Sequence, residues 1–214
     1  LFYFEGEPAN TKLAGMVQGV VTVNPLVRFL YSANQLLPAS KAQQLLPARH
    51  KTDSRDMEGL LHTVPTQLSF TEDDNDRGYQ YLTSVGFENG DKFVCLVARD
   101  SRYLKQVHAE RNWSYHDFRD TNIEDYKQAA LALAKQGYWV FRMGKAVDES
   151  FETDHPHVID YANTIGRSDF LDLWLMANCF FAISTGLGLD SVADVFRRPI
   201  VFVNYVPLMD LEAW

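Results

Sequence analysis

Uniformly apolar runs alternate with helical segments between residues 92 and 204, and this alternation constrains the fold more than any other feature of the sequence. The apolar runs are "KFVCLVA" (92–98), "YWVFRMG" (138–144), "HVIDYA" (157–162), "CFFAIS" (179–184) and "PIVFVN" (199–204). Short runs without polar alternation are typical of strands that are buried on both faces of a sheet.

Helical patterns fill most of the intervals between these runs. They are "TNIEDYKQAALALAKQG" (121–137), "SDFLDLWLMAN" (168–178) and "GLDSVADVF" (188–196). A further helix is expected before the first strand, because Thr71 is a suitable N-cap, Asp74 follows it at capping-box spacing, and Gly86 is a suitable stop. The order β-α-β-β-α-β-α-β predicts an α/β fold with a doubly wound, mainly parallel sheet.

The first 65 residues have a different pattern. "VQGVVTV" (17–23) is compatible with a strand, and "NPLVRFLYSANQLL" (24–37) has apolar residues at helical spacing before Pro38 interrupts the chain. We therefore divide the sequence into residues 1–65, a linker or the remnant of a preceding domain, and residues 66–214, the α/β domain. Because the sequence starts at Leu1 rather than at Met, we also expect a piece of a longer chain.

Composition excludes several classes of protein. An apolar fraction of 46% in 214 residues suffices for a sizeable core, and a formal charge of −8 disfavours a nucleic-acid-binding protein that neutralises phosphates. Cys95 and Cys179 lie in apolar runs, which predicts buried thiols rather than a disulfide or a metal site. No signal peptide or membrane span is evident, so we expect a cytoplasmic protein, either free or peripheral at the inner membrane.

Ligands of doubly wound sheets bind beyond the carboxyl ends of the strands, so the polar residues that follow each strand are the site candidates. They are Arg99, Asp100, Ser101 and Arg102; Arg142 and Gly144; Asp160, Tyr161, Ser168 and Asp169; Ser184, Thr185, Gly186 and Gly188; and Asn204. Arginine offers a rigid fork of donors that suits phosphate, and a glycine turn before a helix offers amide N–H groups. Together these residues predict an anion site.

Each candidate also has a structural explanation. Arg99 is also suited to pair with an acid such as Asp100 or Asp169, and Arg142 to form a structural ion pair. Ser168 is a suitable N-cap, with Asp169 in the first helical turn. The turn "STGLGLD" (184–190) is neither the dinucleotide-binding G-x-G-x-x-G motif nor a P-loop.

Other chemistries have weaker support in the sequence. "HPH" (155–157) lacks further ligands at zinc spacing, no G-x-S-x-G motif indicates a serine hydrolase, and no D-x-D motif indicates a metal-bound diphosphate. We therefore expect neither a metal nor a cofactor.

Three segments in order resemble a family. "FVCLVARDSRYLK" (93–105), "FRDTNIEDYKQAALALAKQGYWVFRMG" (118–144) and the segment from "VIDYANTIGRSDF" to "NYVPL" (158–208) are similar to a family of bacterial glycosyltransferases. The likeness includes the preceding "LSFTEDDNDRGYQYLTSVGF" (68–87) and, more loosely, "NPLVRFLYSANQLLP" (24–38), so it extends back to about Asn24. The family is distantly similar to fucosyltransferases of the GT-B architecture. The resemblance implies two Rossmann-like domains, of which the C-terminal one binds a nucleotide sugar without an essential metal.

The resemblance also implies roles for particular residues. Arg99 matches the arginine of a strand-end H-x-R element that contacts the donor diphosphate, although the histidine of that element is replaced by Val97. The donor-binding loop corresponds to Ser184, Thr185, Gly186, Gly188 and Asp190, with Leu187 where a small hydroxyl residue is common. Recurrent family positions without an assigned role are Arg119, Asp120, Arg142, Gly144, Asp160, Tyr161, Ser168 and Asp169.

From this resemblance we expect an enzyme that transfers a sugar from a nucleoside-diphosphate sugar to a glycan or related acceptor. Arg99 is the candidate catalytic residue, because it would stabilise charge on the leaving diphosphate. The alternative is a Rossmann-like domain that binds a nucleotide sugar or phosphate without catalysis, and a third is an interaction module without a ligand. The sugar, the base and the acceptor are not predicted.

Overall fold

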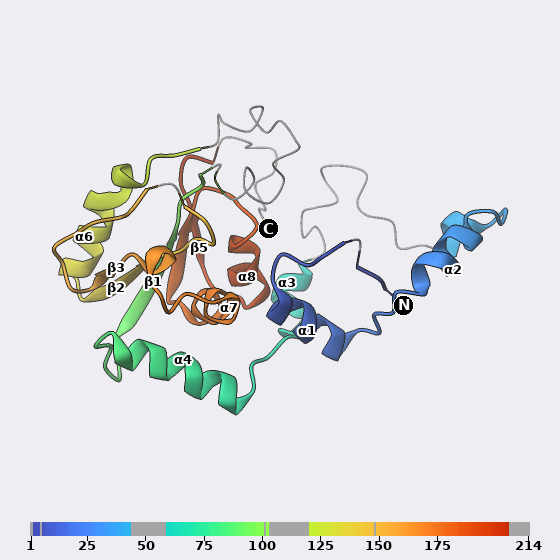
Figure 1. Cartoon of the computed structure of the whole chain (residues 1–214), viewed down its shortest axis with the longest axis horizontal. Coiled ribbons are helices and arrows are strands. Elements are labelled where there is room, and N and C mark those ends of the chain that lie inside the picture. The colour runs from blue at the N-terminus through green and yellow to red at the C-terminus, as the bar shows by residue number, and fades with distance from the viewer. Residues whose placement is uncertain are drawn as a thin grey trace. The chain divides into compact units, whose positions relative to one another are not determined.

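The computed structural model describes residues 2–4, 6–43, 59–100, 102, 120–147 and 149–205, and the chain divides into two compact units (Figure 1). One unit ends at Ser69. The other begins at Phe70 and contains the sheet and all the candidate site residues that the structure describes. Arg119 and Ser101 lie outside the described residues.

The described part of the first unit contains three short helices, α1 (Thr11–Val20), α2 (Val27–Asn34) and α3 (Leu60–Thr63), and a 3-10 turn at Ser40–Gln43. The strand expected at residues 17–23 is wrong, because α1 occupies most of this segment. Asn10 caps α1, since its Oδ1 accepts a hydrogen bond from Leu13 N at 3.0 Å. This local cap starts a helix that outweighs the β preference of the valines. In the described part of this unit, strand pairing is limited to a single bridge between Phe2 and Val23.

The second unit opens with α4 (Glu72–Ser84), which begins as its sequence predicts. Thr71 Oγ1 accepts from Asp74 N at 3.1 Å, and Asp74 Oδ2 accepts from Thr71 N at 3.2 Å. This reciprocal capping box satisfies two N–H groups that the helix itself leaves unpaired. Gly86 follows the end of the helix with φ +98°, a conformation that favours glycine.

Five parallel strands form the sheet, in the order β3-β2-β1-β4-β5. Their bounds are β1 (Lys92–Val97), β2 (Tyr138–Arg142), β3 (Val158–Ile159), β4 (Phe181–Ser184) and β5 (Ile200–Phe202). β1 lies at the centre and pairs with β2 on one side and β4 on the other. The predicted α/β class and parallel sheet are confirmed, and in the described residues every strand pair is parallel. The third strand is shorter than expected, because Tyr161–Asn163 forms a 3-10 turn.

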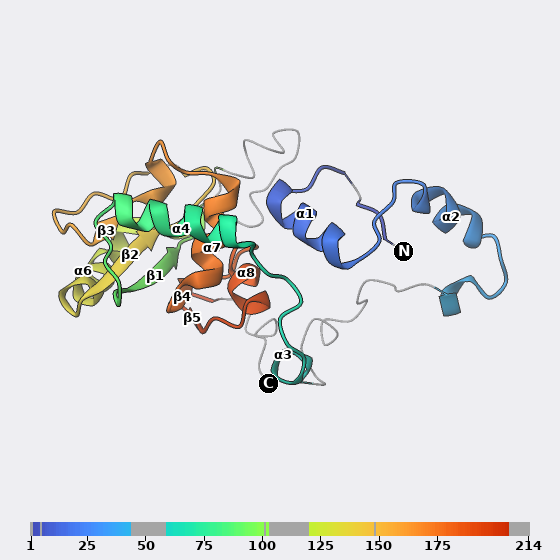
Figure 2. The ribbon, with the colours of Figure 1, turned by 90° about the horizontal axis from the view of Figure 1, so that it is seen from below.

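Helices cover both faces of the sheet. On one face, the helix α6 (Lys127–Lys135) and the 3-10 turn before it, Ile123–Tyr126, pack on Leu96, Val140 and Val158. On the other face lie α4, α7 (Asp169–Asn178) and α8 (Asp190–Val195), which appear together in Figure 2. This division of the helices is the doubly wound arrangement that the sequence predicts.

The centre of the unit is tightly packed. Gly78 of α4 allows close approach to Trp174 of α7, because a Cβ at Gly78 would lie 2.1 Å from the indole ring. Cys95 and Cys179 are both buried and free, as expected. In the part of the chain that the structure describes, no helix is both long and apolar enough to cross a membrane.

Candidate functional site

The sheet order creates a topological switch point between β1 and β4. From β1 the chain moves outward to β2 and β3, and then α7 returns it to β4 on the other side of β1. The connections that leave β1 and β4 therefore diverge, and ligands of doubly wound sheets usually bind at such a point. Val97 and Ser184 pair at this edge, so the residues that follow them are neighbours.

Arg99 and Thr185 join the two strand ends directly. Arg99 N donates a hydrogen bond to Thr185 Oγ1 at 2.9 Å, and Thr185 N donates to Val97 O at 3.2 Å. Thr185 is 2% exposed, which makes its hydroxyl a fixed part of the site. The sequence predicted both residues for this site, and the structure brings them together.

The guanidinium group of Arg99 lies beside an acid. Its Nε is 3.4 Å from Asp120 Oδ1, and the side chains are 13% and 25% exposed. Of the two acids that the sequence suggested as partners, Asp169 binds elsewhere, to Lys145 and Arg167. Asp120 precedes Thr121, whose N–H donates to Arg99 O at 3.0 Å. This backbone contact positions Asp120 beside the switch point.

The turn after β4 is held by its own side chains. Asp190 Oδ2 accepts from Ser184 Oγ at 2.7 Å and from Leu187 N at 2.9 Å, and Ser184 Oγ accepts from Gly186 N at 3.1 Å. Burial raises the pKa of the Asp190 carboxyl, although its bonds with Ser184 and Leu187 lower it. The Asp190 carboxylate thus already binds one hydroxyl and one amide N–H group of the turn in which the sequence predicts a phosphate.

The two glycines of this turn have different constraints. Gly186 has φ +83°, and a Cβ there would lie 2.4 Å from the ring of Tyr205. Gly188 has no atom within 4 Å of a Cβ position. Gly186 therefore shapes the turn, whereas the Cβ position of Gly188 is open.

Arg142 forms a second group with Asp160, at the ends of β2 and β3. Arg142 Nη1 donates to Asp160 Oδ1 at 3.1 Å, while Asp160 Oδ2 accepts from Phe151 N at 2.8 Å and from Asn163 Nδ2 at 2.7 Å. The Arg142 side chain is 2% exposed. Asp160 is therefore a structural hub, and Arg142 forms the structural ion pair that the sequence allowed as the alternative.

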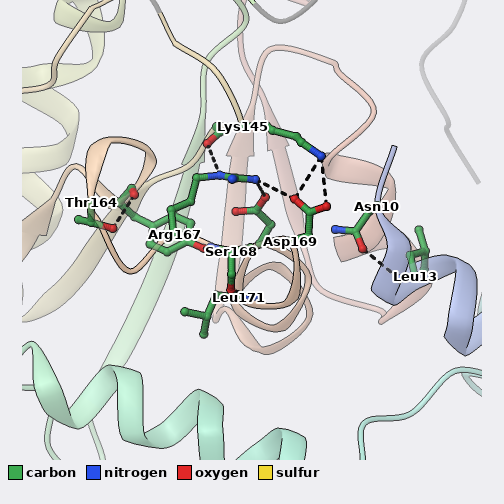
Figure 3. Close-up of polar contacts among 11 residues, drawn as sticks. Asn10, Leu13, Lys145, Thr164, Arg167, Ser168, Asp169 and Leu171 are labelled. Atoms are coloured by element: carbon green, nitrogen blue, oxygen red, sulfur yellow. Dashed lines mark hydrogen bonds and ion pairs between the residues drawn. The ribbon is translucent and has the colours of Figure 1, made fainter. Parts of the chain in front are cut away.

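A third group surrounds Arg167, which the sequence interpretation missed (Figure 3). Arg167 Nε donates to Gly144 O at 3.2 Å, and Nη2 bonds to Asp169 Oδ1 at 3.1 Å and to Asp172 Oδ2. Burial raises the pKa of the Asp172 carboxyl and outweighs the lowering effect of Arg167. We call Arg167, Asp169 and Asp172 the clamp. The sequence signal that could have predicted it is the pair of acids at the first and fourth positions of a helix, directly after Arg167 and Ser168.

Four predicted site residues belong to this third group and have structural roles. Ser168 caps α7, since its Oγ accepts from Leu171 N at 3.2 Å, and Tyr161 Oη bonds to the backbone of Ser168. Asp169 also pairs with Lys145 at 3.1 Å. A Cβ at Gly144 would lie 2.6 Å from Val147, so close packing requires glycine there. These contacts fix the loop before α7.

Two cavities lie at opposite ends of the sheet. A cavity of about 210 Å³ borders the carboxyl ends of β1 and β2, and Arg142 and Asp120 are among its lining residues. A cavity of about 520 Å³ lies at the amino ends, where Lys92, Phe180 and Arg198 contribute to its wall. In the described residues, no cluster of three or more His, Cys, Asp or Glu side chains could hold a metal ion.

The switch point thus gathers six of the predicted site residues, namely Arg99, Ser184, Thr185, Gly186, Gly188 and Asp190. Arg142, Gly144, Asp160, Tyr161, Ser168 and Asp169 belong to the Arg142 and Arg167 groups. Of the remaining candidates, Asp100 Oδ1 accepts from Arg102 N at 3.0 Å, and Asn204 Nδ2 donates to Tyr126 Oη at 2.9 Å. Comparisons of the chain with family models, curated proteins and solved structures found no match.

Proposed function

We propose that the α/β unit binds the diphosphate of a nucleotide sugar at the switch point and is the donor-binding half of a glycosyltransferase. We place this enzyme in the cytoplasm or at the inner face of the inner membrane. One observation carries the proposal: the bond from Arg99 N to Thr185 Oγ1 joins the ends of β1 and β4, so the backbone of Arg99 lies next to the start of the glycine turn. This edge of the sheet is where doubly wound folds bind nucleotides.

The chemistry of the transfer explains why these groups suit the site. As the acceptor oxygen forms a bond to the anomeric carbon, the bond from that carbon to the phosphate oxygen breaks, and negative charge grows on the leaving diphosphate. A guanidinium fork and amide N–H groups stabilise that charge. In the proposed mechanism, Arg99 and the amides of Gly188 and Leu189 supply this stabilisation.

Asp120 does not prevent this role. Its carboxylate lies 3.4 Å from Arg99 Nε and is a quarter exposed. Arg99 is 13% exposed, and 3.4 Å is longer than the roughly 2.7–3.2 Å of a well-formed N–H···O hydrogen bond. A diphosphate carries more charge and more acceptor oxygens than one carboxylate, so it can share or replace this partner.

Calorimetry with UDP, GDP, CDP and CMP tests the proposal on the whole chain. We expect at least one of them to bind, and Arg99→Ala to weaken that binding by about tenfold to a hundredfold, the range of one or two charged hydrogen bonds. Arg198→Ala is the matched control, because it removes an exposed arginine from the amino end of β5. Equal affinity of the Arg99→Ala variant and the wild type would refute the assigned role.

A second candidate function is nucleotide-sugar or phosphate binding without catalysis. The observation that favours it is the Asp190 carboxylate, which holds Leu187 N and the Ser184 hydroxyl inside the turn. Val97 also replaces the histidine that the resembled family has before its arginine. Both features reduce the number of groups that could act on the leaving diphosphate.

Turnover separates the two candidates. A glycosyltransferase releases the nucleoside diphosphate from a nucleotide sugar when an acceptor is supplied, and Arg99→Ala should lower that rate by more than it lowers affinity. A binding protein shows the same affinity without release. UDP- and GDP-sugars with mixed glycan acceptors are the substrates for this assay, and CMP-sugars, which release CMP instead, are the comparison.

A further inference from the structure

Helix α2 of the first unit (Figure 1) presents large apolar side chains to solvent. Leu26, which is the N-cap residue, is 65% exposed, and Phe29 and Leu30 are 72% and 60% exposed. Positions three and four apart share one face of a helix, so these three side chains are neighbours. The turn that follows the helix adds Leu36 and Leu37, which are 86% and 54% exposed. We call these five residues the α2 patch. Scattered apolar side chains are normal on a protein surface, but a contiguous group marks an interaction surface.

The other sides of α2 have different surroundings. Val27 and Tyr31 are half-buried, and the Tyr31 ring lies 6.1 Å from the ring of Tyr3, so this side packs within the first unit. Arg28 and Gln35 are exposed, and their spacing of two helical turns places them together on a polar side. The helix is therefore amphipathic, and the side that it packs on its own unit is not the side of the α2 patch.

The sequence around the patch is basic, although the protein as a whole is acidic. The whole chain contains 28 Asp and Glu residues and has a formal charge of −8, but none of these acids lies between Pro8 and Thr52. The basic residues of the same segment are Lys12, Arg28, Lys41, Arg49 and Lys51, of which the first three belong to the described part of the chain. Electrostatic attraction to an anionic surface therefore acts on this segment, while the acids elsewhere are repelled by such a surface.

We propose that the α2 patch docks the first unit on an anionic lipid surface. An amphipathic helix with Leu and Phe on one side and basic residues nearby lies in the plane of a membrane interface, where apolar side chains enter the acyl boundary and basic ones meet anionic headgroups. A second copy of this segment would instead bring like positive charge to the contact. A lipid surface thus suits both the apolar side chains and the absence of acids. The inference goes beyond the proposed function, because the residues of the switch point take no part in it.

Cosedimentation of the whole chain with lipid vesicles tests this docking. The vesicles consist of phosphatidylcholine alone or of an equal mixture of phosphatidylcholine and phosphatidylglycerol. We expect wild type to bind the mixed vesicles more tightly, and the binding to weaken as salt is added. Phe29→Ser should weaken it by about tenfold, because a large apolar side chain no longer enters the interface. Arg28→Gln should weaken it by about fivefold and reduce the salt dependence, because one cation near the headgroups is lost.

Ile165→Ser is the matched control, because Ile165 is a fully exposed apolar residue of the second unit. This variant should bind the mixed vesicles as wild type does. Phe29→Ser should keep the thermal unfolding midpoint of wild type, so that its weaker binding reports the surface rather than the fold. If its midpoint changes, Leu36→Ser, at the most exposed position of the patch, takes its place with the same expected loss of binding.

Several results would overturn the inference. They are a wild type that binds neither kind of vesicle, equal binding to both kinds, and equal losses in Phe29→Ser and Ile165→Ser. If gel filtration instead shows an oligomer that Phe29→Ser dissociates, and vesicles are not bound, a second copy covers the patch and lipid docking is wrong. Arg99→Ala should bind vesicles as wild type does, and Phe29→Ser should bind nucleotides as wild type does, so this inference and the proposed function can fail separately.

Discussion

Two buried aspartates stand in the first turns of the neighbouring helices α7 and α8, and they differ in the charge of their partners. Asp172 in α7 binds the guanidinium group of Arg167. Asp190 in α8 accepts from uncharged donors, the Ser184 hydroxyl and the amide of Leu187. The two residues are similarly buried, so the difference lies in the charge that surrounds each one.

This difference distinguishes a structural clamp from a ligand site. Arg167 donates hydrogen bonds to Gly144 O, Asp169 and Asp172, so its positive charge is paired with acids inside the fold. At the switch point, the Asp190 carboxylate accepts a hydrogen bond from the neutral Ser184 hydroxyl. Asp190 is close in the chain to Thr185, whose hydroxyl accepts a hydrogen bond from Arg99 N. The Arg99 guanidinium group lies 3.4 Å from Asp120, a looser contact than those that hold Arg167 between Asp169 and Asp172.

The largest effect that we predict comes from breaking the clamp. Asp172→Ala removes a buried partner of Arg167 and should lower the free energy of unfolding by about 3 kcal/mol, because an arginine loses its buried counter-charge. Denaturant unfolding measures this loss. Asp73→Ala, which removes an exposed acid from the first turn of α4, is the control and should cost less than about 1 kcal/mol. A loss at Asp172 no larger than at Asp73 would refute the structural role of the clamp.

A smaller effect separates the two glycines of the turn. Gly186→Ala should destabilise the protein by about 2 kcal/mol, because φ +83° disfavours a Cβ and the Tyr205 ring lies in its path. Gly188→Ala should change stability by less than about 0.5 kcal/mol, since its Cβ position is open. Thermal or denaturant unfolding of the two variants gives the comparison. Similar losses at both positions would contradict the conformation of this turn.

The smallest predicted effect is a pH dependence at Asp190. Burial raises its pKa above the ordinary value of 3.8, so the folded state binds this proton more tightly than the unfolded state does. The resulting stabilisation is complete below pH 3.8 and is lost as the pH rises through the raised pKa. The side-chain amide of the Asp190→Asn variant does not titrate, so the stability of wild type relative to this variant should fall as pH increases over this window.

Unfolding titrations between about pH 3 and pH 7 measure this difference. Asp125→Asn removes an exposed carboxylate and is the control for the loss of one charge. If the stability of wild type relative to Asp190→Asn instead rises with pH, the fold stabilises the charged carboxylate, and the predicted direction of the pKa shift is wrong.

The sequence predicts those parts of the fold that depend on neighbouring residues. The capping box of Thr71 and Asp74, the N-cap at Ser168 and the apolar strands are local signals, and the structure confirms them. The strand expected at residues 17–23 failed because the residue that decides the outcome, Asn10, lies upstream of the valines. The sequence of the first unit contains no local signal as strong as the capping box or the apolar strands of the second unit.

The site is only partly predictable for a physical reason. The rule that ligands bind beyond the carboxyl ends of the strands identifies the residues that reach one edge of the sheet. It correctly placed Arg99 and Thr185, which are 86 positions apart in the sequence, at the same edge. It does not say which arginine meets which acid, because ion pairs depend on side-chain direction and on loop paths. The pairs of Arg99 with Asp120 and of Arg167 with Asp172 therefore emerged only from the structure.

The location of bound nucleotide tests the central claim most directly. Amide NMR spectra of the ¹⁵N-labelled chain, titrated with GDP or UDP, should show the largest shifts at Arg99, Gly186 and Gly188, at the carboxyl ends of β1 and β4. Shifts confined to Gly90, Lys92 and Phe180 would place the ligand in the cavity of about 520 Å³ at the amino ends. That result would contradict the assignment of the switch point as the nucleotide site.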